Sequence, residues 1–462
     1  MQVLEYLAHV GFNDPVIISL FLIFVLGVGL QWIAQIKEIP GIVLLLPAGM
    51  FFGAYLGLIN PTTLFGESFY TLVTLGVGFL LFAGGLHLDL SKLKENEKLA
   101  IGRLIPINTI LCLTVGTLAI TYLFSMKWYD ALLISSLLVV SGPTVIGPIL
   151  DYANPNPKLR HIANWEAIIT DPLGAVMATI IMYLLIIFRN PNSIMTSTTS
   201  PFNSALHLAL QHSIFHISVF DDILFGDLVI TAVLGIFMGC LLGVLLAAFY
   251  IQAKNRGYIQ KNYLLLVVWM LVFGGVLLGE ILFPESGLFT ALVIGIVIAN
   301  KEKKNAAITK KLNEFAEPII IGILFIALSS MVNIGQLIDY LIPSLILVAL
   351  YVIVIRPLTA FLGAYKYDIT LKEILFLGFI HPRGIVAAAS ASLFALKLEA
   401  GGIHIPQLVP VVFIVILATV IIYGLFTPVL TRKLGLSMDS PKKSYEDNER
   451  SILKTLGLKL NK

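Results

Sequence analysis

The stretch SGPTVIGP at residues 141–148 interrupts an apolar run at residues 131–150 that is long enough to cross a lipid bilayer as a helix. Proline removes a backbone donor and glycine weakens a helix interior, so we expect this segment to be broken near the middle of a membrane. Freed backbone groups at that depth are tolerated only where protein or a water-filled cavity receives them. The stretch therefore predicts a polar site inside a membrane protein.

A second stretch of this kind, HPRG at residues 381–384, lies in another apolar run. A span needs about 20 mostly apolar residues, and the chain offers thirteen candidates, of which the interrupted runs are the fifth and the twelfth. The thirteen are residues 15–36, 41–59, 69–88, 100–125, 131–150, 164–188, 228–252, 263–283, 286–300, 314–332, 337–365, 372–397 and 406–431.

The order of these spans predicts an inverted repeat. If the seventh span is a linker, six spans precede it and six follow, and each span of the first half crosses in the opposite direction to its counterpart in the second. Interruptions at corresponding spans then point to a transport site. The breaking residues are Gly142, Pro143, Pro382 and Gly384. The alternative is a pair of ordinary proline kinks.

The composition agrees with an all-α polytopic membrane protein. Hydrophobic residues make up 58% of the 462 residues and charged residues only 12%, against about 25% charged in soluble domains. Disorder, a coiled coil and a nucleic-acid partner all need more charge than this. The two cysteines, Cys112 and Cys240, lie in apolar runs, so neither a disulfide framework nor a thiolate metal site is expected, and no cofactor is implied.

The charges also predict an orientation. With thirteen spans, Lys and Arg gather in the loops on one side, and Lys127, Arg189 and Lys397 are the exceptions on the other. By the positive-inside rule we expect the N-terminus outside and residues 432–462 as a short cytoplasmic tail. The protein itself would lie in the plasma (inner) membrane. The long external loop, residues 189–227, carries three histidines that we interpret as solvated, although metal binding or pH sensing remains an alternative. They are His207, His212 and His216.

Ionisable residues inside spans mark functional sites by default, because they are expensive there. The sixth span carries Glu166 and Asp171, which point about 140° apart on a helix, whereas Thr170 lies about 40° from Glu166. Arg356 and Arg383 are the buried cations and need carboxylate or carbonyl partners. Pairing either arginine with Glu166 leaves Asp171 as the free titratable carboxylate. The alternative is one structural network of all four charges.

In these features the chain resembles members of the cation:proton antiporter superfamily, and specifically of its NhaP-like sodium/proton exchanger branch. The resemblance covers nearly the whole chain and implies that Asp171 binds the monovalent cation and the proton, that Glu166 pairs with an arginine, preferably Arg356, and that Thr144 offers an oxygen. It also implies a homodimer. The motifs that carry it are Pro143-Thr144, Glu166-xxxx-Asp171, Arg356-Pro357 and Pro382-Arg383-Gly384.

Three positions depart from the pattern of that family. Thr170 stands where members typically have Asn or Asp, Val145 where many have Asp, and Ala167 where a serine is frequent. The site has fewer oxygens as a result, so the choice among Na⁺, K⁺ and Li⁺ stays open.

We therefore expect a transporter rather than an enzyme, exchanging one cation for one proton by competition at Asp171, with Thr144, Thr170 and Ser141 as further oxygen ligands. Residues 1–431 would form the transmembrane domain: spans 4–6 and 11–13 a transport bundle, spans 1–3 and 8–10 a scaffold for dimerisation, and span 7 a linker. The alternatives are a transporter of another substrate, such as an organic anion, an intramembrane aspartyl protease, which needs two aspartates sharing a proton, and a channel.

Glycines recur at every fourth position in the second and the seventh spans. Such ladders let helix backbones approach closely, either within one chain or across a homodimer interface. The glycines are Gly49, Gly53, Gly57, Gly235, Gly239 and Gly243.

Overall fold

The computed structural model describes residues 15–37, 39–66, 68–88, 94–189, 224–260, 263–283, 286–365, 367, 369–400 and 402–438. Within these ranges the regular structure is helical, apart from an isolated bridge between Pro155 and Ser437. The histidines of the external loop and residues 439–462 lie outside the described residues.

The helices follow the apolar runs of the sequence. Three of them contain a π-helical segment, labelled η. In chain order the elements are α2 (Pro15–Ile36), α3 (Ile42–Gly49), η1 (Met50–Tyr55), α4 (Pro61–Phe65), α5 (Ser68–Leu86), α6 (Glu95–Leu111), η3 (Cys112–Gly116), α7 (Thr117–Leu123), α8 (Trp128–Leu137), α9 (Pro143–Ala153), α10 (Pro157–Arg189), α12 (Leu224–Asn255), α13 (Leu264–Leu282), α14 (Ser286–Lys301), α15 (Lys303–Ser329), α16 (Ile334–Asp339), α17 (Leu341–Leu350), η6 (Tyr351–Ile355), α18 (Arg356–Ala364), α19 (Leu371–Phe379), α20 (Ile385–Ala400) and α21 (Leu408–Leu434).

Eight helices in the described part of the chain are long and apolar enough to cross a membrane, and three shorter apolar helices accompany them. The outer helices leave large apolar side chains exposed, for example Phe21 on α2 and Phe237 on α12. Lipid is the solvent that suits such a surface. The described part of the chain is thus all-helical, and the protein is a multi-pass membrane protein.

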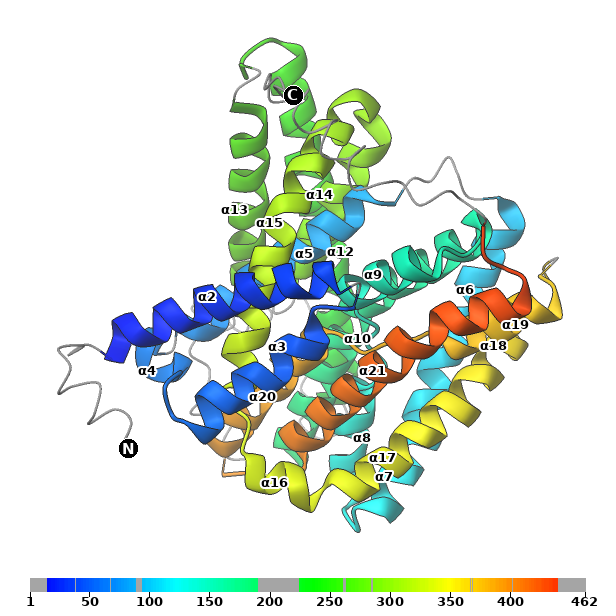
Figure 1. Ribbon diagram of the computed structural model, residues 1–462. Helices are drawn as coiled ribbons and strands as arrows, with labels where there is room; N and C mark the ends of the chain where they lie inside the picture. The colour runs from blue at the N-terminus through cyan, green and yellow to red at the C-terminus, as the bar shows by residue number, and fades with distance from the viewer. Residues whose placement is uncertain are drawn as a thin grey trace, which may run out of the picture.

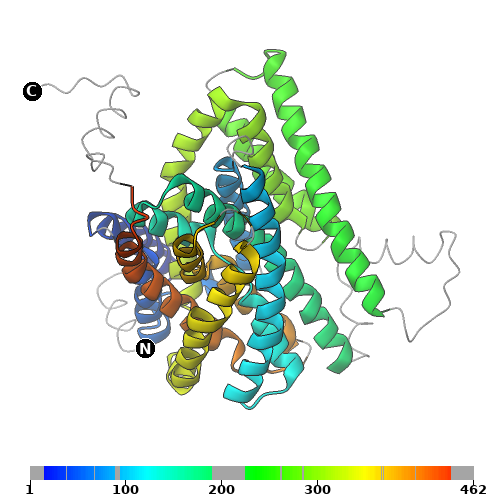
Figure 2. The ribbon, with the colours of Figure 1, turned by 90° about the vertical axis from the view of Figure 1, so that its right-hand side faces the viewer.

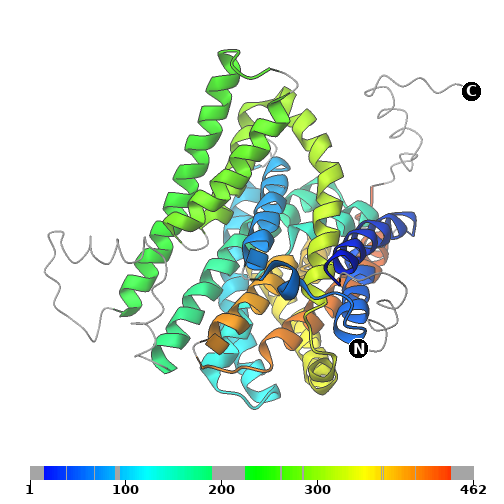
Figure 3. The ribbon, with the colours of Figure 1, turned by 90° about the vertical axis from the view of Figure 1, so that its left-hand side faces the viewer.

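The helices pack in two groups, each built from both halves of the sequence (Figure 1). In the first, α5 packs on α13 and α14, and α2 and α3 pack on α15. The long helix α12 packs on α13 and α14 and lies at the edge of the molecule (Figures 2 and 3). In the second group, α10 and α21 pack around α8, α9, α19 and α20, and α6 packs on α18.

The glycine ladders are used within the chain. A Cβ at Gly49 or Gly53 would overlap Ser329 or Ser330 at the end of α15, and a Cβ at Gly239 would overlap the backbone of Ser286 at the start of α14. Gly57 lies beyond η1 and has a positive φ of 68°. These close approaches build the first group of helices.

Three local features differ from what the apolar runs indicate. Helix α10 continues through Pro172 without a break. The fourth and the eleventh expected spans each contain a π segment, η3 and η6, and these two segments contact each other. A π segment holds an extra residue in a helical turn and often marks a functional site. The spacing of apolar residues in the sequence does not reveal a π segment, because the helix is apolar both before and after it.

Candidate functional site

The two interrupted helices cross each other in direct contact. Helix α8 ends at Leu137 and α9 begins at Pro143, while α19 ends at Phe379 and α20 begins at Ile385. The carbonyl of Pro382 accepts hydrogen bonds from the backbone N–H of Gly142 at 3.1 Å and from the Ser141 hydroxyl at 3.3 Å.

Glycine is required on both sides of this crossing. A Cβ at Gly142 would overlap the backbone of Gly384, and a Cβ at Gly384 would overlap the backbone of Gly142. The breaks therefore meet at backbone distance, which a larger residue on either side would prevent.

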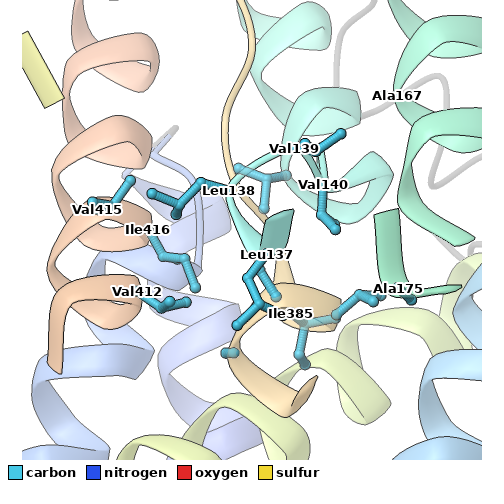
Figure 4. Packing of buried hydrophobic residues seen from close by; sticks show 14 of the residues in the cluster. Leu137, Leu138, Val139, Val140, Ala167, Ala175, Ile385, Val412, Val415 and Ile416 are labelled. Atoms are coloured by element: carbon cyan, nitrogen blue, oxygen red, sulfur yellow. The ribbon is translucent and has the colours of Figure 1, made fainter. Parts of the chain in front are cut away.

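Apolar side chains surround the crossing (Figure 4). They come from the end of α8 and the non-helical residues after it, from the start of α20 and from the first turns of α21, and all are buried. Apolar surroundings of this kind raise the free-energy cost of burying an unpaired charge. The residues are Leu137, Leu138, Val139, Val140, Ile385, Val412, Val415 and Ile416.

Glu166 and Arg356 form a buried, two-pronged ion pair between α10 and α18. Arg356 Nη1 donates to Glu166 Oε1 at 2.5 Å and Arg356 Nη2 to Oε2 at 2.7 Å. The side chain of Arg356 is only 3% exposed and that of Glu166 only 2%. Arg356 thus donates to both carboxylate oxygens of Glu166, which is the bidentate arrangement of an arginine and a carboxylate.

Asp171 lies five residues further along α10 and is 2% exposed. None of the ion pairs in the described ranges includes it, and its Oδ1 atom is buried with no hydrogen-bond partner there. A buried carboxylate oxygen without a hydrogen-bond partner is expensive. A proton or a small cation on Asp171 would remove that cost.

The other proposed ligands lie close to these residues in the chain or at the crossing. The Thr170 hydroxyl donates to the carbonyl of Glu166 at 2.6 Å, which leaves its oxygen free to accept. Ser141 sits in the fifth-span break. The backbone of Thr144 belongs to the first turn of α9, whereas its side chain lies outside the described residues. Pro172 deprives the carbonyl of Ile168 of its usual helical donor.

Arg383 makes a different set of contacts from Arg356. Its Nη1 atom donates to the carbonyls of Val139 and Val140 at 3.3 and 3.2 Å, and its guanidinium lies 5.1 Å from the centre of the Tyr351 ring. Its described contacts do not include Glu166. A cation at these carbonyls complements the negative end of the α8 dipole, so Arg383 stabilises the break rather than the acid.

Sequence reasoning missed a polar cluster behind the crossing. His381 Nε2 lies 3.3 Å from Asn108 Nδ2, and both residues are buried. Cys112 Sγ lies 3.8 Å from Asn108 Oδ1, and the Ser135 hydroxyl donates to the carbonyl of Cys112 at 2.5 Å. The available signal was Asn108 itself, an amide in the middle of an apolar run.

The fold and the site define a membrane transporter with discontinuous helices. The family model "Sodium/hydrogen exchanger, transmembrane" matches residues 16–433. The chain belongs to this family, and the resemblance to the NhaP-like antiporter branch is confirmed.

Similar proteins give the same result. The chain is 24% identical to Na(+)/H(+) antiporter 1 of Methanocaldococcus jannaschii, over 83% of this chain and 84% of that protein. It is 22% identical to the low-affinity Na(+)/H(+) antiporter NhaS1 of Synechocystis, over 79% of this chain and 64% of that one. These relatives are transporters, not enzymes.

A solved structure shares the fold. It is the sodium proton antiporter MjNhaP1 from Methanocaldococcus jannaschii at pH 8, with a TM-score of 0.70 and 21% identity. The match covers 91% of this chain and 98% of that one.

Proposed function

We propose that the protein exchanges one monovalent cation for one proton, and that both ions compete for Asp171. The observation that carries the proposal is the unpartnered Oδ1 atom of Asp171, on a helix whose other buried acid is paired with Arg356. Na⁺ is the first candidate because the similar proteins are named sodium antiporters, with K⁺ and Li⁺ as alternatives. Exchange of this kind serves pH homeostasis.

The exchange is electroneutral in this proposal. Of the two buried acids on α10, Asp171 is the one outside an ion pair in the described structure, and Thr170 before it cannot hold a second proton. One cation then replaces one proton, so no net charge crosses the membrane. The membrane voltage, worth about 2.3 kcal/mol per charge per 100 mV, supplies no drive in such a cycle.

We also propose thirteen crossings related by an inverted repeat. The eight long helices, the three shorter apolar ones and the two broken pairs would make this number. Corresponding contacts support the repeat: α9 packs on α21 as α20 packs on α10, and α8 packs on α10 as α19 packs on α21. The π segments η3 and η6 fall in the fourth and the eleventh spans, which correspond.

In the cycle, α6 to α10 and α16 to α21 would move as the transport bundle against α2 to α5 and α13 to α15, with α12 as the linker. The grouping of helix contacts supports this division. The placement in the plasma membrane, with the N-terminus outside, rests on the Lys and Arg distribution. The homodimer rests on the family resemblance.

A flux assay tests the function. Purified protein in vesicles with an internal pH dye should move protons when Na⁺, K⁺ or Li⁺ is added outside, and Asp171→Asn should abolish the signal. The control is Asp339→Asn, which neutralises an exposed carboxylate at the end of α16. Flux that survives in Asp171→Asn, or an inactive wild type, would contradict the proposal.

A further inference from the structure

The chain that follows α21 folds back onto the loop between α9 and α10 (Figure 1). Met438 N donates to the carbonyl of Asn154 at 3.0 Å, and Asn156 N donates to the carbonyl of Leu436 at 3.1 Å. Between these bonds, Pro155 and Ser437 face each other as an antiparallel bridge. Proline suits this position, because a non-hydrogen-bonded pair needs no donor there.

Asn154 strengthens this contact with its side chain. Its backbone is left-handed, with φ 43° and ψ 53°, which asparagine tolerates better than most residues. Its Nδ2 atom donates to the carbonyl of Met438 at 2.8 Å. The residue therefore ends α9 and also holds the chain that follows α21.

The same loop is tied to α19. Asn156 Nδ2 lies 3.4 Å from Glu373 Oε1, and Lys158 Nζ lies 3.1 Å from Glu373 Oε2. Glu373 in turn accepts from the backbone N–H of Thr370 at 2.8 Å, in the first turn of α19. At the end of α9, Arg160 Nη2 donates to the carbonyl of Leu150 at 2.8 Å.

These contacts join one end of each of four elements: α9, α10, α19 and α21. The four elements build the candidate ion site. Helix α9 starts at the fifth-span break, α10 carries Asp171, and α19 leads to the twelfth-span break. Helix α21 carries Thr419, whose hydroxyl lies 3.4 Å from the backbone N of Arg383.

We propose that residues 436–438 act as a clasp that positions α9, and that the clasp stays closed while the ion is carried. This inference rests on the proposed exchange. Helix α9 is a half-helix of 11 residues whose N-terminal end follows a non-helical break. The crossing with the twelfth-span break holds its first residues, and the clasp holds its other end, so a small displacement at the clasp tilts the helix and moves the backbone beside Thr144.

The affinity for the cation is the property that should change when the clasp is lost. Asp171 stands on the long helix α10 and keeps its surroundings when the clasp is lost, so protonation and the carrier motion persist. The oxygens at the start of α9 would be displaced, and a displacement of about 1 Å is enough to weaken a site. We expect a higher half-saturating Na⁺ concentration at a nearly unchanged maximal rate.

Two truncations separate the clasp from the chain beyond it. Ending the protein after Met438 removes residues 439–462 and keeps the clasp, and half-saturation should stay as in the full chain. Ending it after Gly435, whose left-handed backbone closes α21, should raise the half-saturating concentration about tenfold, as expected for the loss of a few hydrogen bonds. Equal half-saturation in the two truncated proteins would overturn the inference.

A point substitution tests the clasp independently, in case the shorter protein does not fold. Asn154→Gly keeps the left-handed conformation and removes only the side-chain donor, so it should raise the half-saturating concentration in the same direction by a smaller factor. A wild-type value would count against the clasp. If the full chain shows no exchange at all, the proposed function fails instead, and the two failures are distinguishable.

A cross-link tests whether the clasp stays closed. Pro155→Cys with Ser437→Cys places two thiols at a non-hydrogen-bonded pair, where Cα atoms lie about 4.5 Å apart and a disulfide fits. The background carries Cys112→Ala and Cys240→Ser. The oxidised protein should exchange at the rate of the reduced one. Exchange that stops on oxidation and returns with reductant would show that the clasp has to open.

Discussion

Glu166 and Asp171 are five residues apart on α10, about 1.4 helical turns, and their side chains have different surroundings. Glu166 is saturated by Arg356, whereas Asp171 has an oxygen without a partner among the described residues. The residues alone supplied the two acids and two candidate arginines without choosing between the arginines, the family resemblance favoured Arg356, and the structure shows that pair. That choice depends on which arginine the tertiary structure brings to α10 and which it brings to the carbonyls at the end of α8.

At this scale, Glu166→Gln should destabilise the protein. The change leaves Arg356 buried without its carboxylate, which costs about 3 to 5 kcal/mol. Thermal unfolding of the purified protein in detergent should shift to lower temperature. The control is Glu166→Gln combined with Arg356→Gln, which removes both charges and should recover part of the loss. An unchanged midpoint in the single variant would contradict the pairing.

The contact between His381 and Asn108 makes a second residue-scale prediction. His381→Leu should leave the Nδ2 group of Asn108 without its described partner, at a cost of about 1 to 3 kcal/mol in unfolding free energy. His381→Gln retains a group that accepts a hydrogen bond and should lose less. The double variant with Asn108→Leu should cost less than the sum of the single losses. Additive losses would show that the two side chains do not interact.

At the scale of elements, proline and glycine in the sequence predicted where helices stop, and the chain is non-helical at residues 138–142 and 380–384. Their mutual contact was not predictable, because nothing in residues 141–148 specifies that Pro382 supplies the acceptor. The π segments were missed for a similar reason: an added residue in a turn of an apolar helix leaves no compositional trace. Pro172 shows the converse, since packing keeps α10 helical through a proline.

The crossing predicts a sharp difference between two glycines of the fifth span. Gly142→Ala should abolish exchange and reduce the yield of folded protein, because the added methyl overlaps the backbone of Gly384. Gly147→Ala, inside α9, has open space for its methyl and should be neutral or stabilise by up to about 1 kcal/mol. Expression, melting temperature and flux of the two variants check this. Equal behaviour would argue against the close crossing.

For the whole molecule, the proposed exchange is electroneutral because Asp171 is the buried acid of α10 that no ion pair engages in the described structure. A voltage imposed across vesicles with a K⁺ gradient and valinomycin should leave the rate of Na⁺-driven proton movement unchanged. The control uses vesicles with the same K⁺ gradient but without valinomycin. A rate that rises and falls with voltage would require a second charge at the site, and therefore a second titrating group.

Competition at Asp171 is tested most directly by measuring Na⁺ binding to the purified protein by calorimetry at a series of pH values. If one proton leaves for each cation bound, the apparent Kd should rise about tenfold for each unit that the pH falls in the acidic range, and Asp171→Asn should not bind. A Kd independent of pH, or binding of undiminished strength in Asp171→Asn, would contradict the account.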